Sequence, residues 1–460
     1  MLFSSLTFLL GFLPLSLVIY NLNKNITYKN IVLFILSLGF YAWGEPKTLL
    51  LILIVILMNY YLGIKIEDNK TSKNILILGI ILNGSLLFFF KYFNFFVNKI
   101  LMLNKDLSSI ILPLGISFYI FKLISYLSDI YTGKTKAERN MLNFANFVLM
   151  FPQFIAGPLV RYETIKDALA NRETNIDDIA IGLRRFIFGL GKKIIIANQL
   201  AIISDKIFKS VPLNEMSTSL AWIGALVYTL QIYFDFSGYS DLAIGLGRMF
   251  GFKFLENFNY PYMASSVSDF WKRWHISLSS FFKDYIYIPL GGSRVSLARW
   301  ILNIFVVWSF TGLWHGASWN FIFWGLYFGI MLVLEKFVLN KLLKNLVVIH
   351  RIITLLIIVI GWVLFNSSSA SQIVSILSNM FILNGDFNLR LLNNLGILYL
   401  WPYVLFGFIG CTNLVKNTIE KIQTNKFGCI IIDTYLLVVL GISLVFLVNS
   451  SYNPFIYFKF

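Results

Sequence analysis

Charged residues are scarce in this sequence of 460 residues. Asp, Glu, Lys and Arg together make up 13% of it, whereas hydrophobic residues make up 58%. Because a water-soluble domain usually carries about 25% charged residues, this composition excludes an ordinary soluble protein and favours a lipid bilayer as the main solvent. Long polar stretches are also missing, since the longest, Lys65–Asn74 and Arg161–Asp178, are each under twenty residues. We therefore expect one continuous membrane-embedded domain, residues 1–460, without an attached soluble catalytic domain.

Histidine and cysteine are almost absent, with three and two copies. Cys411 and Cys429 both border apolar runs, and we interpret them as buried thiols rather than as a disulfide or part of a metal site, which normally needs more ligands. The sequence also lacks a G-x-S-x-G elbow, a P-loop and a dinucleotide fingerprint, which argues against a covalent serine hydrolase or a nucleotide-dependent enzyme. We predict no metal site and no bound cofactor.

The net charge of +16 would suggest nucleic-acid binding in a soluble protein. Here the basic residues gather in what we expect to be short loops and span ends, where they set orientation and contact anionic lipids. No nucleic-acid partner is therefore expected. The basic clusters are Lys65, Lys70 and Lys73; Lys134, Lys136 and Arg139; Arg184, Arg185, Lys192 and Lys193; and Lys336, Lys341 and Lys344.

Uncharged runs suited to transmembrane helices recur along the chain. A spanning helix needs roughly 17–25 apolar residues, and we expect about eleven spans, the shorter ones with snorkelling or protein-shielded ends. The first run has neither the basic start nor the cleavage site of a signal peptide, so it counts as a retained span. The longer runs are Leu2–Tyr20, Met141–Val160, Met216–Phe234, Leu391–Val415 and Thr434–Phe458, and the shorter ones are Ile31–Trp43, Thr48–Gly63, Ile75–Phe90, Ile110–Phe121 and Ile352–Phe365.

Two apolar segments contain residues that fit lipid badly. FPQFIAGPLVR (Phe151–Arg161) carries two prolines and a glycine, and YFDFSGYSDLAIGLGRMFG (Tyr233–Gly251) carries Asp235 and Asp241. Broken backbone and carboxylates at membrane depth are tolerated where protein buries them or where they line a cavity. We expect Arg161 and Asp235 to be buried polar residues that shape a path through the protein, each with a partner.

The stretch SVSDFWKRWHISLSSFFKDYIYIPLGG (Ser266–Gly292) has apolar residues at helical spacing with basic and polar residues between them. This pattern predicts one amphipathic helix with a cap at Ser266, and its basic, tryptophan-rich character suits the membrane interface. His275 lies on this predicted helix. Arg273 beside it suits the phosphates of coenzyme A, a phosphopantetheine arm or lipid headgroups, and the pattern leaves these alternatives open.

His315 stands inside thirty-five residues, Trp300–Leu334, that contain no Asp, Glu, Lys or Arg. The run suits two short spans joined by a break, with Gly312 and Gly316 on either side of the histidine. An intramembrane imidazole is a functional hypothesis by default, and a neutral imidazole is suited to general-base chemistry. The alternative is a histidine satisfied by a backbone carbonyl between helices. His350, beside Arg351 at a span edge, is interpreted as an interfacial residue.

These motifs resemble the membrane-bound O-acyltransferase family and, within it, the bacterial alginate O-acetyltransferase branch. Several motifs in one order are specific, and together they cover nearly the whole chain. The segments are LPLGISFYIFKLISYLSDIYTGK (Leu112–Lys134), FPQFIAGPLVR, DFSGYSDLAIGLGRMFG (Asp235–Gly251), RWHISLSSFFKDYIYIPLGG, GLWHGASWNFIFWGLYFG (Gly312–Gly329) and NPFIYFKF (Asn453–Phe460).

The resemblance implies an all-α polytopic membrane fold, with tilted transmembrane helices and re-entrant and interfacial helices around a central funnel. It implies His315 as the catalytic residue and His275 as a supporting or second catalytic residue. We expect six further residues to bind substrate or line the tunnel, and no metal to take part. These residues are Asp235, Arg273, Trp314, Trp319, Asn320 and Arg161.

The resemblance also implies the reaction. An acetyl group would pass from a cytoplasmic thioester, acetyl-CoA or a carrier-linked donor, to a hydroxyl at or beyond the outer face of a bacterial cytoplasmic membrane. Relatives that modify extracytoplasmic polysaccharides usually work with a separate acetyl-transferring protein that bears a serine nucleophile, and such a partner is expected here. The polymer itself stays undetermined.

Two other functions are kept open. The sister branch that passes D-alanine toward teichoic acid shares the histidine region, and a lipid hydroxyl is a further acceptor for the same chemistry. A transporter or flippase is less favoured, because such proteins usually show inverted repeats or paired broken helices, and no repeat is visible in this sequence.

Overall fold

A computed structural model describes residues 1–69, 73–107, 109–154, 157–382, 392–393 and 395–449. Helices are the only regular elements in these ranges, so the all-α prediction is confirmed for the described part of the chain. The motif Asn453–Phe460, Lys70 and part of Phe151–Arg161 lie outside the described residues.

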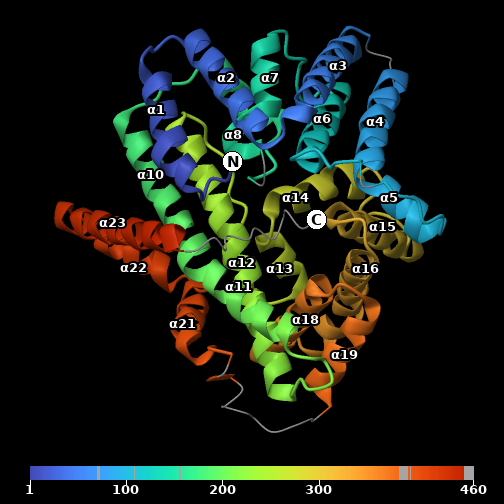
Figure 1. Cartoon of the computed structure of the whole chain (residues 1–460). Coiled ribbons are helices and arrows are strands. Elements are labelled where there is room, and N and C mark those ends of the chain that lie inside the picture. The colour runs from blue at the N-terminus through green and yellow to red at the C-terminus, as the bar shows by residue number, and fades with distance from the viewer. Residues whose placement is uncertain (70–72, 108, 155–156, 383–391, 394, 450–460) are drawn as a thin grey trace. The chain divides into compact units, whose positions relative to one another are not determined.

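The first group of helices precedes the long helix α12 (Figure 1). These helices are α1 (Leu13–Asn21), α2 (Ile26–Gly44), α3 (Leu49–Asp68), α4 (Lys73–Leu87), α5 (Phe93–Phe95), α6 (Ile116–Tyr131), α7 (Met141–Leu149), α8 (Phe151–Phe154), α9 (Tyr162–Ala170), α10 (Ile176–Gly191) and α11 (Asn198–Asp205). A π-helical segment, Lys192–Ala197, joins α10 to α11.

The remaining helices begin with α12 and run to the end of the described chain. They are α12 (Thr218–Met249), α13 (Val267–Arg273), α14 (Ile276–Phe282), α15 (Leu297–His315), α16 (Trp319–Leu334), α17 (Asn340–Leu342), α18 (Val347–Asn366), α19 (Ala370–Phe381), α21 (Trp401–Gly410), α22 (Leu414–Ile422) and α23 (Lys426–Asn449).

Eight helical segments of the described chain are long and apolar enough to cross a membrane, and a bent pair would make nine. The chain is therefore a multi-pass membrane protein, although the expected number of about eleven spans is not confirmed. The eight are Ile26–Gly44, Pro46–Asp68, Lys73–Ile100, Ile176–Ser210, Leu297–His315, Trp319–Leu342, Val347–Asn366 and Lys426–Asn449, and the pair is Leu398–Gly410 with Leu414–Ile422.

The prediction for Trp300–Leu334 is confirmed, because α15 and α16 are two spans separated by a break that begins at Gly316. Other predicted spans are shorter than expected. The N-terminal apolar helix covers only Thr7–Asn21, and Met141–Val160 breaks after α7. Both are below the roughly 17 residues that a spanning helix needs.

Three further predictions differ from the structure in extent. Met216–Phe234 lies within α12, which has 32 residues and is not among the eight candidate spans. Leu391–Val415 includes residues outside the described ranges, and its described part bends by 75° between α21 and α22. Thr434–Phe458 begins inside α23, and its last nine residues are not described. Each run is apolar, but apolar character alone does not fix where a helix bends or ends.

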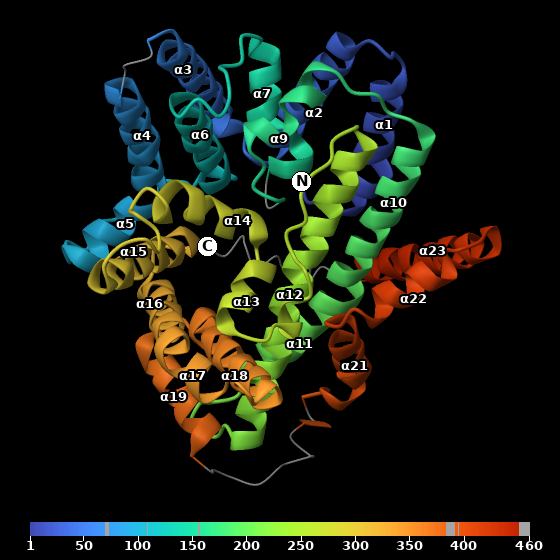
Figure 2. The same cartoon turned by 180° about the vertical axis from the view of Figure 1, so that it is seen from behind.

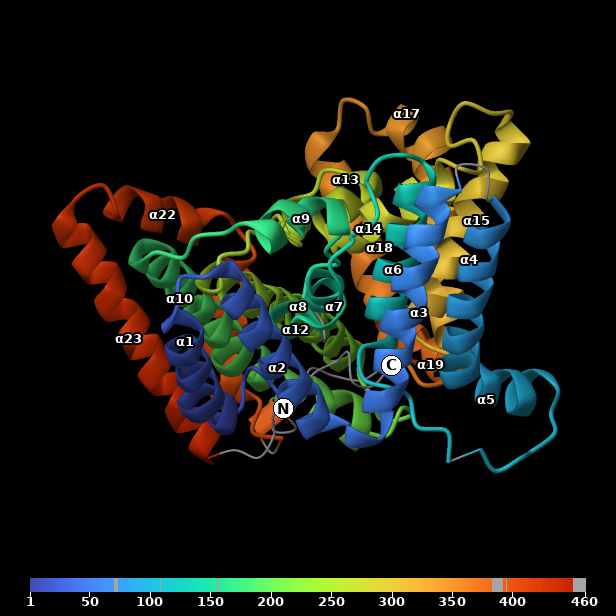
Figure 3. The ribbon, with the colours of Figure 1, turned by 90° about the horizontal axis from the view of Figure 1, so that it is seen from above.

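The chain divides by its contacts into two units, and α10 and α12 each contribute to both. The first unit comprises Met1–Phe186 and Ser240–Glu256. In it α3, α4 and α6 lie side by side (Figure 3). Asn59 of α3 and Asn83 of α4 are fully buried and exchange amide hydrogen bonds of 3.1 and 2.7 Å. The exchange satisfies two polar groups that would be costly to leave unpaired in an apolar environment.

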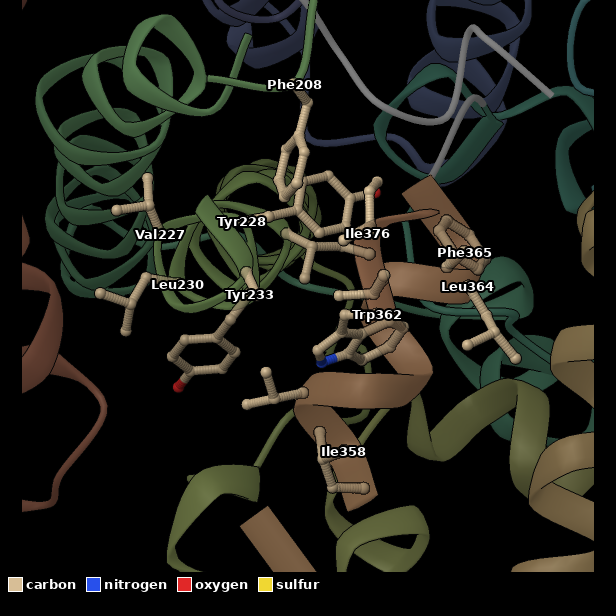
Figure 4. Close-up of a cluster of buried hydrophobic side chains, with 14 of the residues drawn as sticks. Phe208, Val227, Tyr228, Leu230, Tyr233, Ile358, Trp362, Leu364, Phe365 and Ile376 are labelled. Atoms are coloured by element: carbon tan, nitrogen blue, oxygen red, sulfur yellow. The ribbon is translucent and has the colours of Figure 1, made fainter. Parts of the chain in front are cut away.

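The second unit comprises Ile187–Tyr239 and Asn257–Phe460. In it α13, α16 and α18 pack against one another, and α15 pairs with α16 (Figure 2). Its hydrophobic core is rich in aromatic side chains. Figure 4 shows Tyr228 and Tyr233 on α12, with Trp362 and Phe365 on α18. The two candidate histidines, His275 and His315, belong to this unit.

The basic residues Arg184, Arg185, Lys192 and Lys193 lie neither in a short loop nor at the end of a helical segment, which corrects the sequence interpretation. They lie inside the continuous helical segment Ile176–Ser210. Within the first unit, the Arg185 guanidinium bonds the Asp241 carboxylate at 2.8 Å, and within the second, Lys193 pairs with Asp235. Because these charges are neutralised by carboxylates of α12, a helix tolerates them where the sequence suggested a loop.

Candidate functional site

His315 is the last residue of α15, and Gly316 ends the helix. The two helices on either side of this break lie very close together. A methyl group at Gly312 would collide with the backbone oxygen of Phe321, and one at Gly316 would lie 2.5 Å from the Phe321 ring. The glycines are therefore needed because α16 packs directly onto the last turn of α15.

The imidazole of His315 is only 6% exposed and is surrounded by aromatic rings. Its centroid lies 5.0 Å from the Trp314 ring, 5.0 Å from the Trp324 ring and 5.1 Å from the Phe365 ring. The last two rings come from α16 and α18. Such an environment is apolar and rigid, which limits the access of water to the imidazole.

His275 lies close to the same tryptophan. Its ring centroid is 5.7 Å from the Trp314 ring and 4.6 Å from the Phe236 ring of α12. His275 is 2% exposed, and this burial lowers its pKa to about 3, so its imidazole is neutral at physiological pH. The structure thus brings two histidines, forty residues apart in sequence, into contact with the same tryptophan, Trp314.

The backbone bends at His275, which corrects the prediction of one continuous amphipathic helix. Helix α13 ends at Arg273 and α14 begins at Ile276, while His275 has φ 45° and ψ 53° in the left-handed region. A non-glycine residue in this region is uncommon and needs support from its surroundings. Val267, Phe270 and Trp274 lie in the hydrophobic core of the second unit, and Leu278, Phe281 and Phe282 of α14 are also buried.

The start of α13 is held at two places. As predicted, Ser266 is the N-cap, with its hydroxyl accepting from Asp269 N at 3.1 Å. In addition, the buried carboxylate of Glu335 accepts from Val267 N at 2.5 Å and from both Ser268 N and the Ser268 hydroxyl. A carboxylate at this position satisfies helix N–H groups that have no partner inside the helix.

We expect Glu335→Ala to lower the free energy of unfolding by roughly 2–4 kcal/mol, because buried donors that lose their acceptor cost about 1–3 kcal/mol each. The measurement is the thermal midpoint of the purified protein in detergent. Glu335→Gln keeps one acceptor oxygen, so its thermal midpoint should fall less than that of Glu335→Ala. Glu420→Ala, which removes a 62% exposed carboxylate from a surface ion pair, should leave the midpoint unchanged. Equal midpoints for the Glu335 and Glu420 variants would contradict the anchoring role.

The buried ion pair of Asp235 and Lys193 lies next to this site along α12. Asp235 Oδ1 and Lys193 Nζ are 2.5 Å apart, with side chains 3% and 2% exposed. Phe236, the next residue on the helix, packs on His275. Lys193 is thus the partner that the sequence led us to expect for Asp235. Its position was not predicted, because it lies in a segment that we had interpreted as a loop.

The other expected site residues differ in their surroundings. Asn320 is buried, and its amide donates to Phe365 O at 3.4 Å. Arg273 bonds Asp269 at 2.8 Å and is one-third exposed, which suits a rim position. Trp319 is 48% exposed and stacks on Phe323, unlike the buried Trp314. Arg161 precedes α9 in the first unit and is partly buried.

Four residues near the histidines were not found from the sequence. Trp324 and Phe365 lie in apolar helices, where any aromatic residue looks like core. Asn257 and Glu335 carry a polar group, but neither belongs to a motif with a known chemical meaning. The only feature of Asn257 and Glu335 that the sequence shows is a polar side chain beside an apolar run, and many residues of this chain share that feature.

The chain is similar to known transferases over much or all of its length. Residues 47–369 match the model of the membrane-bound O-acyltransferase family. The chain is 38% identical to a probable alginate O-acetylase, AlgI, of Pseudomonas putida, with 100% of both proteins covered. It is 34% identical to a peptidoglycan O-acetyltransferase of Helicobacter pylori, covering 100% of this chain and 98% of that protein. It is 28% identical to a teichoic acid D-alanyltransferase of Bacillus subtilis, covering 49% of this chain and 59% of that protein.

Proposed function

We propose that this chain moves an acetyl group from a cytoplasmic thioester to a hydroxyl outside the membrane, for O-acetylation of an extracytoplasmic polysaccharide. The chain belongs to the membrane-bound O-acyltransferase family and is therefore an acyltransferase. One observation carries this proposal: a buried imidazole, His315, stands at the break between two membrane spans, and a second buried imidazole, His275, packs against the same tryptophan, Trp314. The relatives that are similar over the whole chain are named for O-acetylation of alginate and peptidoglycan.

In the proposed reaction His315 acts as the general base. Its imidazole takes the proton from the acceptor hydroxyl, and the oxygen attacks the carbonyl carbon of the thioester. The tetrahedral intermediate then breaks its carbon–sulfur bond, and the thiolate leaves with the proton returned by the imidazolium. One ester forms and one thioester breaks, so no oxidant, metal or further reactant is needed.

The aromatic rings around His315 support this assignment. Trp314, Trp324 and Phe365 leave little room for water beside the imidazole. Excluding water matters because a water molecule would compete with the acceptor hydroxyl and hydrolyse the donor. Asp235 and Asn320 shape the surroundings of the site, Trp319 and Arg161 remain proposed path residues, and Arg273 at its rim suits an anionic part of the donor.

We place the enzyme in a bacterial cytoplasmic membrane, with acetyl-CoA or a carrier-linked thioester as donor. The acceptor hydroxyl that reaches His315 belongs to a serine of an extracytoplasmic partner protein or to the glycan itself. The chain has little soluble mass outside its helices to bind a polymer, since its long polar stretches are each under twenty residues. A separate partner would supply that function.

The second candidate is D-alanyl transfer toward teichoic acid. It is supported by the similarity to teichoic acid D-alanyltransferase, which extends over half of this chain. Expression of the chain together with its partner genes and its polymer, in a host that lacks its own polymer acetylation, followed by mass spectrometry of alkali-released groups, separates the two. Acetate in the wild-type sample would support the proposed acetyl transfer. D-Alanine in that sample would instead support the second candidate, D-alanyl transfer. Absence of both would contradict acyl transfer to a polymer.

We expect His275→Ala to reduce acetyl transfer by roughly 10²–10⁴-fold, the usual contribution of a positioned acid or base. The matched control is His350→Ala, because His350 lies in the first turn of α18 and is not buried. The control should retain wild-type turnover, measured as acetyl-CoA consumed by membranes with equal amounts of protein. Equal losses in both variants would show that the wrong histidine has been assigned to the site.

A further inference from the structure

We propose that Asn257 is a positioning residue that fixes the imidazole of His275 as the Nδ1-protonated tautomer, so that Nε2 carries the lone pair. The inference rests on the proposed role of His275 in acyl transfer. Asn257 lies eighteen residues before the histidine and is fully buried. It is not among the site residues that the sequence predicted.

The orientation of the Asn257 amide follows from its hydrogen bonds to Ser277. Ser277 N lies 3.1 Å and the Ser277 hydroxyl 2.8 Å from Asn257 Oδ1. A backbone N–H only donates, so the amide atom that faces it must be the oxygen and not the NH₂ group. The usual ambiguity between the two ends of an asparagine side chain is therefore resolved here by the protein itself.

The tautomer of His275 follows from that orientation. Its Nδ1 lies 3.3 Å from the same Asn257 oxygen. A neutral imidazole has one N–H and one lone pair, and a lone pair facing a carbonyl oxygen would be repelled. The proton therefore belongs on Nδ1, and Nε2 is the acceptor. Burial lowers the pKa of His275 to about 3 and so keeps the imidazole neutral.

Asn257 also holds the backbone that carries the ring. Its carbonyl oxygen accepts from Ile276 N at 3.0 Å, and two residues later Asn259 N donates to Arg273 O at 2.9 Å. These bonds bracket the left-handed residue His275. One short segment thus sets both the position of the imidazole and the nitrogen that bears its proton, which is the arrangement that orients catalytic histidines in general.

The chemical consequence concerns the proposed transfer. With the proton on Nδ1, Nε2 can accept a hydrogen bond or a proton from a hydroxyl in the site, whereas the opposite tautomer would only donate there. Loss of the Asn257 oxygen should lower kcat by at least about tenfold, because a wrongly placed proton removes most of the contribution of an acid–base group. The KM for the thioester donor should stay unchanged.

The test is nitrogen NMR of the full-length protein in detergent, labelled with ¹⁵N in its histidine rings. Only three histidines are present, so the His275 signals are those that disappear in His275→Asn, a residue that tolerates the left-handed backbone. In wild-type protein Nδ1 should give a protonated-type resonance and Nε2 an unprotonated-type one. An Nε2-protonated signal in wild-type protein would overturn the proposal.

Variants separate the oxygen of Asn257 from general packing. Asn257→Leu should shift the Nδ1 resonance toward the unprotonated type, whereas Asn257→Asp keeps an acceptor oxygen and should keep the Nδ1 proton. Ser277→Ala removes one donor but leaves the backbone N–H that orients the amide, so it should keep the wild-type tautomer. If Asn257→Leu does not fold, the tautomer of His275 is still tested by three spectra, those of wild-type protein, Asn257→Asp and Ser277→Ala. An unchanged tautomer in folded Asn257→Leu would contradict the positioning role.

Activity of the same samples distinguishes this inference from the proposed function. Wild-type protein with the expected tautomer but no acetyl transfer would remove the proposed function and leave the tautomer assignment intact. Acetyl transfer by wild-type protein with the opposite tautomer would overturn the tautomer assignment and leave the proposed function intact.

Discussion

Replacing His315 with alanine should lower acetyl transfer by at least roughly 10²–10⁴-fold, since a positioned acid–base group contributes about that much. In the proposed reaction this imidazole takes the acceptor proton and returns it to the leaving thiolate, and the apolar rings around it offer no substitute. The measurement is the acetyl ester content of the polymer formed by membranes that contain equal amounts of each variant.

The matched control keeps the packing around His315. His315→Gln fills part of the same space among Trp314, Trp324 and Phe365, and it carries no base that titrates near neutral pH. It should be as inactive as His315→Ala, while both variants insert into membranes in amounts close to wild type. Normal acetylation in either variant would remove His315 from the chemistry. Inactive and unfolded protein in both would instead support a purely structural histidine.

Breaking the buried ion pair of Asp235 and Lys193 should destabilise the protein strongly. Asp235→Asn or Lys193→Met each leave one charge buried at a site that is 3% or 2% exposed. Removing one partner of a buried pair typically costs about 3–5 kcal/mol, because the remaining charge has lost its compensation. We expect lower yield and a lower thermal midpoint in detergent for either single variant.

The double variant tests the cause. Lys193→Met combined with Asp235→Leu removes both charges, so it should recover much of the loss, as apolar replacements of buried pairs often do. Glu420→Gln, which removes the charge from an exposed pair with Lys416, should have little effect. A well-folded but inactive Asp235→Asn would move Asp235 into the catalytic group, and single variants as stable as wild type would contradict the structural role.

The position of His315 could be predicted because local sequence determines it. An uncharged run too long for one span must break, and two glycines beside a histidine mark the place. A methyl group at Gly312 or at Gly316 would indeed collide with Phe321 of α16. The resemblance to a family added the role of the residue, which no periodicity or spacing could supply.

The bend at His275 could not be predicted in the same way. Apolar residues continue at helical spacing through Ser266–Gly292 because α13 and α14 both bury their apolar sides. The left-handed backbone at His275 is fixed by Asn257 and Asn259, which lie outside that stretch. The spacing of apolar residues within one segment does not reveal the hydrogen bonds that another segment makes to its backbone.

The helical segment Ile176–Ser210 was missed for a related reason. Four of its basic residues, Arg184, Arg185, Lys192 and Lys193, look like loop or span-end residues when their partners are unknown. The partners of Arg185 and Lys193 are Asp241 and Asp235, which lie 56 and 42 residues further along the chain. Charge compensation between distant segments therefore lets a helix carry basic residues that, taken by themselves, suggested its end.

The central claim, that an acyl group crosses the membrane at His315, is tested most directly by measuring the side on which the ester forms. Inside-out vesicles from cells that express the chain, its partner genes and its polymer present the cytoplasmic face to the medium. Acetyl-CoA labelled with ¹⁴C in the acetyl group is added outside, and alkali-labile label is then counted in polymer recovered from the vesicle lumen. The account predicts luminal acetyl ester with wild-type protein and none with His315→Ala. Label confined to the outer side, or equal luminal label in both samples, would contradict it.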